Sequence, residues 1–276
     1  MATRSKKKDK YFKWAILIFL VVAVAAIYGG YEWWKNRKSR FVRYPAFGIS
    51  IPENYLIHGI DVSKYQQNIS WESVKEMKVR NVQLGFVFIK ATEGIVNTDP
   101  QFKRNWKKSK QAGMIRGAYH FFLATKDGRE QAQNFISMVD LEEGDLPPVV
   151  DIEQTYGVNS AILKKELKEW LDIIENYYNT KPIIYTSVSF YSRHLGKEFN
   201  SYPLWAAHYY QFDTPRIDRN WDFWQHSEEG RVNGILSKVD FNVFNGDSLQ
   251  FRSILMSNSF YLFLYWLTLA KIKLNV

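Results

Sequence analysis

Short apolar runs recur along the chain from Ile57 onward, and together they predict a β-rich fold. Each run is rich in β-branched and aromatic residues and is bounded by polar or turn-forming residues, as strands are. The eight runs are HGIDVS (58–63), LGFVFIKATEG (84–94), IRGAYHFF (115–122), PPVVDIE (147–153), KPIIYTS (181–187), PLWAAHY (203–209), WDFWQHS (221–227) and KVDFNVF (238–244). We therefore predict eight strands.

Helix-like stretches separate the earlier runs. They show helical spacing of apolar residues or capping residues at their ends, and they cover residues 70–79, 99–112, 127–141 and 160–178. Beyond residue 185 the connecting segments are too irregular to predict helices. Strand–helix alternation followed mostly by strands indicates an α/β fold. The simplest closure is an irregular, eight-stranded TIM-like (β/α) barrel.

The N-terminal part of the chain is organised differently. Residues 1–13 are basic, and residues 14–34 are apolar and aromatic over a length that crosses a thin bilayer. Lys and Arg number six before this segment and four just after it. We therefore expect a cytoplasmic tail, a single-pass transmembrane anchor with its N-terminus inside, and an extracytoplasmic body. A cleaved signal peptide is the alternative, since a charged start and a short apolar run fit one too, although AVAA is the sole candidate for a cleavage site and is not a clean one.

Two further segments lie outside the predicted barrel of residues 57–250. Residues 35–56 contain a basic run, two prolines and scattered Gly and Ser, and we interpret them as a linker. Residues 251–276 form an apolar tail of unknown role, whose run FYLFLYWLTLA (260–270) is too short to span a bilayer alone. An interfacial segment, a second anchor and a non-native end all remain open for this tail.

Charge and composition exclude several classes of function. The formal charge is +9, but residues 1–43 hold eleven Lys and Arg against two acids, so the remaining residues sum to zero. The body therefore lacks the basic surface of a nucleic-acid-binding protein. The chain has no cysteine, which excludes disulfides, thiolate nucleophiles and Cys-ligated zinc. The five histidines show no metal-ligand spacing, and we expect neither a metal nor a cofactor.

Acidic residues mark the ends of the predicted strands. Five of them lie inside or just past an apolar run: Asp61, Glu93, Asp151, Glu153 and Asp240. Other acids, such as Glu142, Glu143, Glu228 and Glu229, fit helix faces or loops. In (β/α) barrels, catalytic side chains come from the C-terminal ends of several strands. Because buried carboxylates are costly unless they are paired, we predict that the five form a functional site.

Asp151 and Glu153 form the most informative pair. Residues i and i+2 of a strand share one face, so both carboxylates can enter one cavity while Ile152 points outward. Two acids this close do not both ionise cheaply, and one pKa is expected to rise. A raised pKa is the property required of a general acid near neutral pH, and glycosidic cleavage needs such an acid with a partner.

Taken together, these motifs resemble glycoside hydrolase family 25, the muramidase-type lysozymes. The similarity covers about residues 57–249 and is carried by HGIDVSKYQ (58–66), FIKATEG (88–94), RGAYHFF (116–122), PPVVDIE (147–153), IIYTS (183–187), LWAAHY (204–209), FWQHS (223–227) and VDFNVFNG (239–246). The resemblance implies an irregular α/β barrel. It also implies a monomeric domain that hydrolyses the β-1,4 bond between N-acetylmuramic acid and N-acetylglucosamine in peptidoglycan.

The resemblance also suggests roles for individual residues. Glu153 matches the general acid of the family, and Asp151 matches its partner, which in a substrate-assisted route would orient the substrate N-acetyl group. Retention by substrate assistance and inversion both remain open from the sequence. Asp61 and Asp240 match acids of the same cleft. The positions expected to line or support that cleft are Glu93, Tyr119, Tyr185, Trp205, Trp224 and Gln225.

Two other functions remain open from the sequence. A chitinase-like barrel also carries acids on its fourth strand, but usually in a longer D-x-x-D-x-D-x-E run that LPPVVDIE lacks. A non-catalytic wall-binding anchor would use the same aromatic cleft. The sequence favours a membrane-anchored muramidase that acts in cell-wall remodelling or turnover.

Overall fold

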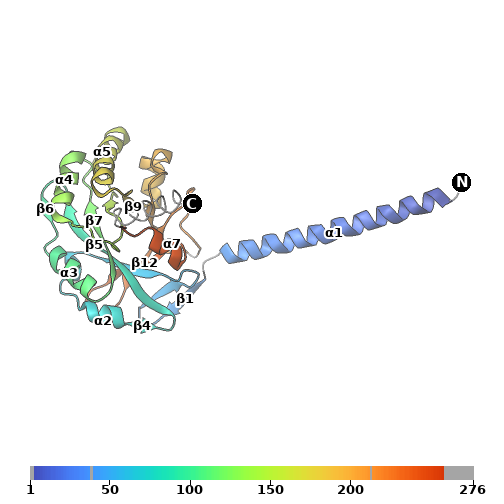
Figure 1. Ribbon diagram of the computed structural model, residues 1–276, viewed down its shortest axis with the longest axis horizontal. Coiled ribbons are helices and arrows are strands. Elements are labelled where there is room, and N and C mark those ends of the chain that lie inside the picture. Colours follow the sequence, from blue (N-terminus) through green and yellow to red (C-terminus); the bar gives the residue numbers. More distant parts are fainter. Residues whose placement is uncertain (1–2, 38–39, 212, 258–276) are drawn as a thin grey trace, which may run out of the picture. The chain divides into compact units, whose positions relative to one another are not determined.

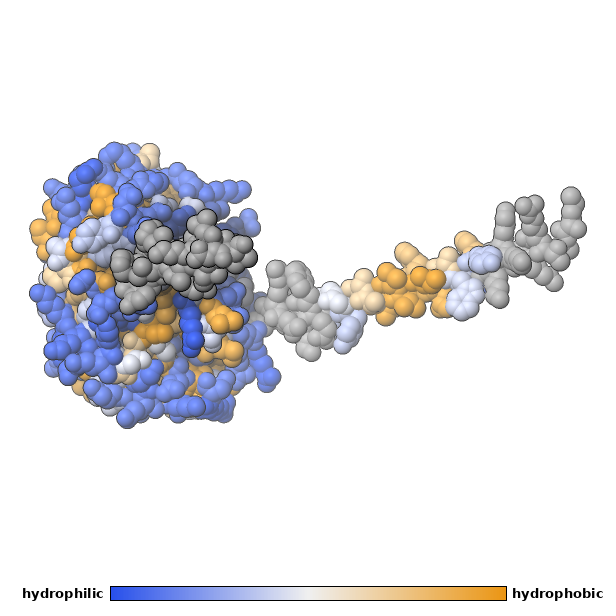
Figure 2. All heavy atoms as spheres, viewed as in Figure 1, coloured by the Kyte–Doolittle hydropathy of each residue, from blue (hydrophilic) through white to orange (hydrophobic). Residues whose placement is uncertain are grey.

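The computed structural model describes residues 3–37, 40–211 and 213–257. The chain forms two compact units, one containing helix α1 (Thr3–Arg37) and the other beginning at Phe41. Residues Tyr11–Tyr31 of α1 are long and apolar enough to cross a membrane, with a mean hydropathy of 2.2, and their apolar side chains are exposed (Figure 2). A membrane anchor and a signal sequence both meet this criterion.

All eight predicted strands are present, and they close into a barrel (Figure 1). The order around it is β3-β12-β11-β10-β9-β8-β7-β5, and pairing of β3 with β5 closes the circle. Their bounds are β3 His58–Val62, β5 Val82–Glu93, β7 Ile115–Phe121, β8 Val149–Asp151, β9 Ile183–Ser187, β10 Leu204–Ala207, β11 Phe223–Gly230 and β12 Val239–Phe244. Strand β12 pairs antiparallel with both neighbours, whereas the other barrel pairs are parallel.

Four helices pack outside the first half of the barrel, and all four were predicted. They are α2 Trp71–Glu76, α3 Phe102–Gln111, α4 Gly128–Met138 and α5 Ser160–Tyr178. Helix α5 shows how the sequence defines these helices. The Asn159 side chain caps its first turn, and Asn179 ends it in a left-handed conformation. Its apolar stripe, which includes Leu163, Leu167 and Trp170, is fully buried.

The regular strand–helix repeat ends after β9, so the barrel departs from a TIM-like pattern there. The connection to β10 holds short turns: α6 Val188–Phe190, a π-helix Tyr191–Leu195 and a 3-10 helix Lys197–Phe199. Among the described residues no helix joins β10 to β11, and β11 and β12 pair antiparallel. Short elements complete the fold: a 3-10 helix Lys64–Gln66, β4 Lys78–Val79 and β6 Asn97–Thr98.

The region predicted to be a linker contains a folded hairpin, so that prediction is wrong for residues 41–52. Strands β1 (Phe41–Tyr44) and β2 (Ile49–Pro52) pair antiparallel. Phe47 in their turn is fully buried and contacts Phe241 of the barrel, with ring centroids 5.3 Å apart. The proline and glycine that suggested a linker lie in this turn, and the buried aromatic residues make the hairpin part of the barrel unit.

The barrel interior is packed with side chains and is closed at one end by helix α7 (Ser248–Ser253). Phe251 of α7 contacts Phe86 and Phe244, with ring centroids 5.6 and 5.0 Å apart. The backbone of Met256 also hydrogen-bonds to that of Asp145. Residues 251–256 are therefore part of the barrel rather than of a tail. The apolar run at 260–270 lies outside the described residues.

Candidate active site

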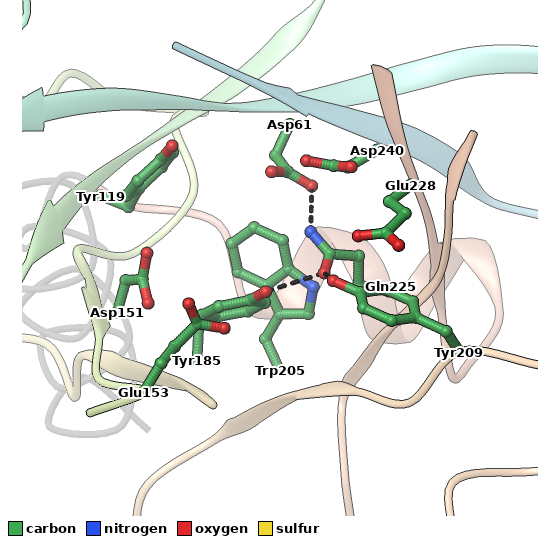
Figure 3. Close-up of a pocket in the computed structure, with 10 residues that line it drawn as sticks. All are labelled: Asp61, Tyr119, Asp151, Glu153, Tyr185, Trp205, Tyr209, Gln225, Glu228 and Asp240. Carbon is green, nitrogen blue, oxygen red and sulfur yellow. Dashed lines mark hydrogen bonds between the residues drawn. The ribbon is translucent and has the colours of Figure 1, made fainter. Parts of the chain in front are cut away.

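The four acids predicted to be catalytic meet at the open end of the barrel. Asp61 lies near the C-terminal end of β3, Asp151 ends β8, and Glu153 follows two residues later. Asp240 lies near the start of β12, but this strand runs in the opposite direction and pairs Asp240 with Asp61. All four line one cavity of about 210 Å³ (Figure 3).

Four of the six residues predicted to bind substrate line the same cavity, namely Tyr119, Tyr185, Trp205 and Gln225. Trp224 does not, because alternation along β11 turns it outward when Gln225 points inward. Its ring is fully buried against Phe41 of the hairpin, and its indole nitrogen donates to the His208 carbonyl at 2.9 Å.

Glu93 is the other predicted binding residue that does not line the cavity. It is the last residue of β5 and forms an ion pair with Lys90, with an Nζ–Oε2 distance of 2.5 Å. Glu93 nevertheless lies near enough to Asp151 for its charge to raise the pKa of that carboxyl. We therefore assign Glu93 to the electrostatic surroundings of the site rather than to its lining.

Two lining residues were not predicted. Glu228, interpreted from sequence as a loop acid, lies on β11 and enters the cavity. A β-bulge explains this: Gln225 pairs with Asn242 while Ser227 pairs with Phe241, so one extra residue reverses which side chains point inward. Tyr209, which follows β10, donates a hydrogen bond from its hydroxyl to the side-chain oxygen Oε1 of Gln225.

Hydrogen bonds fix one wall of the cavity. Oδ2 of Asp61 accepts from Nε2 of Gln225 at 2.8 Å and from Nδ2 of Asn242 at 2.7 Å. The Trp205 indole in turn donates to Oδ1 of Asn242 at 2.7 Å, and the Tyr185 hydroxyl donates to Oε1 of Gln225 at 2.8 Å. Each donor is thus held by a further side chain, which preorganises this wall.

Asp151 and Glu153 form the opposite wall. Asp151 is only 8% exposed, and its Oδ1 has no hydrogen-bond partner among the described residues. Burial, followed by the charge of Glu153, raises the pKa of Asp151 well above its usual range. Burial also raises the pKa of Glu153, and the nearby Tyr185 hydroxyl partly opposes this rise. At least one carboxyl of the pair therefore tends to keep a proton.

Comparison of the sequence with models of protein families shows which family has this site. The model of glycosyl hydrolases family 25 matches residues 60–235, which is more than half of the chain. The chain belongs to glycosyl hydrolase family 25. It is therefore a glycoside hydrolase, and the cavity with its acids is the candidate active site of a family 25 enzyme.

Individual relatives agree with this family. Lysozyme M1 of Streptomyces globisporus is 32% identical over 219 residues, which cover 72% of this chain and 71% of that protein. An uncharacterized protein of Escherichia coli (strain K12), YegX, is 46% identical over 201 residues, 73% of this chain and 74% of its own. A solved family 25 glycosyl hydrolase from Bacillus anthracis matches with a TM-score of 0.67 and 31% identity, over 73% of this chain and 94% of that one.

One group of acids away from the cavity has the spacing of metal ligands. Carboxylate oxygens of Asp127, Glu166 and Glu169 lie within 4.8 Å of one another. Protein groups already use this cluster, because Glu166 accepts from the Gly128 amide and Glu169 pairs with Arg129, both at 2.8 Å. The cluster thus has a structural role. That the enzyme needs no cofactor remains an expectation from its sequence.

The raised pKa of a buried acid makes the stability of this family 25 enzyme depend on pH. Burial and the charge of Asp61 raise the pKa of Asp240 to about 9. The folded protein therefore holds a proton that the unfolded chain releases near pH 4. This stabilisation is complete below about pH 4 and is lost as the pH rises towards about 9.

We expect Asp240→Asn to reduce the fall in Tm between about pH 5 and about pH 9, because the amide does not ionise. Thermal unfolding of the full chain in detergent at both pH values measures this difference. The matched control is Asp218→Asn, at an exposed acid outside the cavity. The same fall in Tm for wild type and Asp240→Asn would contradict the effect that we assign to this carboxyl.

Proposed function

We propose that this enzyme is a peptidoglycan muramidase that hydrolyses the β-1,4 bond between N-acetylmuramic acid and N-acetylglucosamine. Glu153 acts as the general acid and Asp151 as the assisting carboxylate. One observation carries the proposal: the two acids form one wall of a cavity in which burial raises the pKa of both. Relatives named lysozyme or N,O-diacetylmuramidase support the choice of substrate.

The unpartnered oxygen of Asp151 suggests how the roles divide. Oδ1 is buried and accepts no hydrogen bond from the part of the chain that the structure describes, so a substrate N–H group would satisfy it. An N-acetyl amide supplies such a donor beside the bond to be cleaved. A hydrogen bond to the ionised form lowers the pKa of Asp151, so the proton shared by the pair moves to Glu153. Substrate binding thereby places the proton on the general acid.

Bond cleavage then follows from this protonation state. Glu153 donates its proton to the glycosidic oxygen as the bond to the anomeric carbon breaks, and positive charge develops on the sugar ring. Asp151 holds the N-acetyl group so that its carbonyl oxygen bonds to the anomeric carbon as the leaving sugar departs. Water then attacks that carbon and releases the acetamido oxygen, while Glu153 takes a proton from the water and returns to its acid form. The opposite wall, with Asp61, Gln225 and Asp240, offers acceptors and donors for sugar hydroxyls.

The proposed setting is the outer face of a membrane. The apolar stretch Tyr11–Tyr31 supports an anchor with its N-terminus inside and the barrel outside. A monomeric catalytic domain held there reaches nearby glycan, which fits cell-wall remodelling or turnover better than digestion of distant material.

Product analysis tests this function. Purified peptidoglycan glycan is digested with the full chain in detergent, and the new reducing ends are identified by reduction and mass spectrometry. We expect N-acetylmuramic acid at the new reducing ends. N-acetylglucosamine there would contradict the assigned bond. Cleavage of chitin oligomers without cleavage of peptidoglycan would favour the chitinase-like alternative.

A further inference from the structure

A second cavity adjoins the catalytic one and shares Glu153 with it. It has a volume of about 350 Å³ and lies between the segment after β8 and the turns after β9. The lining residues that matter here are Glu153, Thr155, Tyr156, Ser187, Arg193 and His194. Since Glu153 lines both cavities, a group bound in the second one lies close to the bond that Glu153 protonates.

The backbone around this cavity has unusual conformations. Tyr156 has a φ of 49°, in the left-handed region that non-glycine residues rarely adopt. Arg193 and His194 lie in the π-helix Tyr191–Leu195, a conformation that is frequent at functional sites. Tyr156 lines this cavity together with Glu153, and burial followed by the charges of nearby acids raises the pKa of its hydroxyl.

Arg193 is oriented but not neutralised. Its Nε donates to the Ser189 carbonyl at 3.2 Å, while its two terminal nitrogens have no partner among the described residues. His194 is held by a hydrogen bond between its Nδ1 and the Ser160 hydroxyl at 3.0 Å, so its Nε2 is left for a ligand. The two side chains thus bring several hydrogen-bonding nitrogens to one side of the cavity.

The two cavities differ in charge: acids alone charge the lining of the catalytic cavity, whereas the adjoining cavity combines the shared Glu153 with the cation Arg193. Five acids line the catalytic cavity, and none of its lining residues is Lys or Arg: the acids are Asp61, Asp151, Glu153, Glu228 and Asp240. An anionic substrate group is repelled there. Arg193 brings a cation to the adjoining cavity, where a guanidinium can bind a carboxylate with two parallel hydrogen bonds.

We propose that the cavity around Arg193 and His194 binds a carboxylate carried by the substituent of the muramyl residue next to the cleaved bond. This inference rests on the proposed muramidase function. The lactyl ether of N-acetylmuramic acid ends in a carboxylate when no peptide is attached. When a stem peptide is attached, the peptide itself supplies carboxylates. Both sources present the same chemistry to Arg193.

The test compares three glycans. The first carries stem peptides, the second is stripped to free lactyl carboxylates, and in the third these carboxylates are converted to neutral amides. Wild type, Arg193→Gln and Arg193→Lys are assayed as full chains in detergent. Lys197→Gln is the matched control, because Lys197 is an exposed cation four residues away that does not line the cavity.

For Arg193→Gln we expect KM to rise about tenfold on carboxylate-bearing glycan, with kcat unchanged, because a charge-assisted hydrogen bond is lost. Arg193→Lys should recover part of this loss, and Lys197→Gln should match wild type. On the neutral glycan, wild type and Arg193→Gln should have equal KM. A rise in KM only on the stripped glycan identifies the lactyl carboxylate, and a rise only on the peptide-bearing glycan identifies the stem peptide. A rise on both shows that Arg193 binds a carboxylate from either source.

Two results would overturn the inference alone: an unchanged KM for Arg193→Gln on all three glycans, or an equal rise in KM on charged and neutral glycan. Failure of wild type to cleave any of the three glycans would instead overturn the proposed muramidase function, and the inference with it. The two failures are therefore distinguishable.

Discussion

Replacing Glu153 with Gln is expected to lower kcat on peptidoglycan by about 10³-fold, the usual range for loss of a general acid. The amide keeps the shape of the side chain and its place beside Tyr185. It has no acidic proton to give to the leaving oxygen. The measurement is steady-state hydrolysis of glycan by the full chain, together with calorimetric binding of a muramyl oligosaccharide.

We expect Glu153→Gln to bind the oligosaccharide about as tightly as wild type, since the other residues of the cavity are unchanged. Glu229→Gln is the matched control, because Glu229 is exposed and pairs with Lys238 outside the cavity. A Glu153→Gln variant with more than about a tenth of wild-type kcat would exclude Glu153 as the essential acid.

Replacing Asp151 with Asn is expected to lower kcat by about 10²-fold while it raises stability. Catalysis falls because a neutral amide binds the N-acetyl N–H more weakly than a carboxylate does. Stability rises because the raised pKa of Asp151 marks a carboxyl whose ionised form is unfavourable in the folded state. That penalty is absent below about pH 4 and grows as the pH rises through the folded-state pKa.

At neutral pH the gain from Asp151→Asn should be about 1 kcal/mol, or about 3 °C in Tm for a domain of this size. Thermal unfolding of wild type and Asp151→Asn at about pH 7 and about pH 4 measures this gain. The difference in Tm between the two proteins should shrink at the lower pH. A loss of kcat with an equal loss of Tm would instead indicate that Asp151 supports the fold rather than the reaction.

The strands of the barrel could be predicted because their residues carry a local signal. Runs such as 181–187 and 203–209 are short, apolar and bounded by turn residues, and β9 and β10 lie within them. Helix α5 was predicted for the same reason, since its apolar residues recur at helical spacing and are buried together.

The hairpin formed by β1 and β2 could not be predicted from local pattern. Its strands have four residues each, and its stability depends on contacts with residues far away in sequence. Phe41 packs on Trp224, and Phe47 packs on Phe241. The position of helix α7 could not be predicted either, because Phe251 joins the barrel core only through contacts with residues that are distant in sequence.

Within the site, positions that depend on one strand could be predicted, whereas positions that depend on how strands pair could not. The i, i+2 argument correctly placed Asp151 and Glu153 in one cavity, with Ile152 packed outward. It could not show that β12 is antiparallel, which is why Asp240 reaches the rim from the start of its strand. The bulge in β11, which brings Glu228 inward, leaves no mark in the sequence that pattern reading detects.

Trp224 shows a limit of family resemblance. The motif FWQHS (223–227) spans both faces of β11, so it contains the cavity residue Gln225 and the buried outer residue Trp224. Matching the motif therefore locates the strand, but only the register separates residues that meet the substrate from residues that support the barrel.

A crystal structure of Glu153→Gln with a muramyl oligosaccharide across the cavity tests the account most directly. We predict that the amide at position 153 lies within hydrogen-bond distance of the glycosidic oxygen, about 3 Å, and that Asp151 accepts a hydrogen bond from the N-acetyl group of the adjacent sugar. An oligosaccharide whose glycosidic oxygen faces another acid, or that binds outside the cavity, would contradict it.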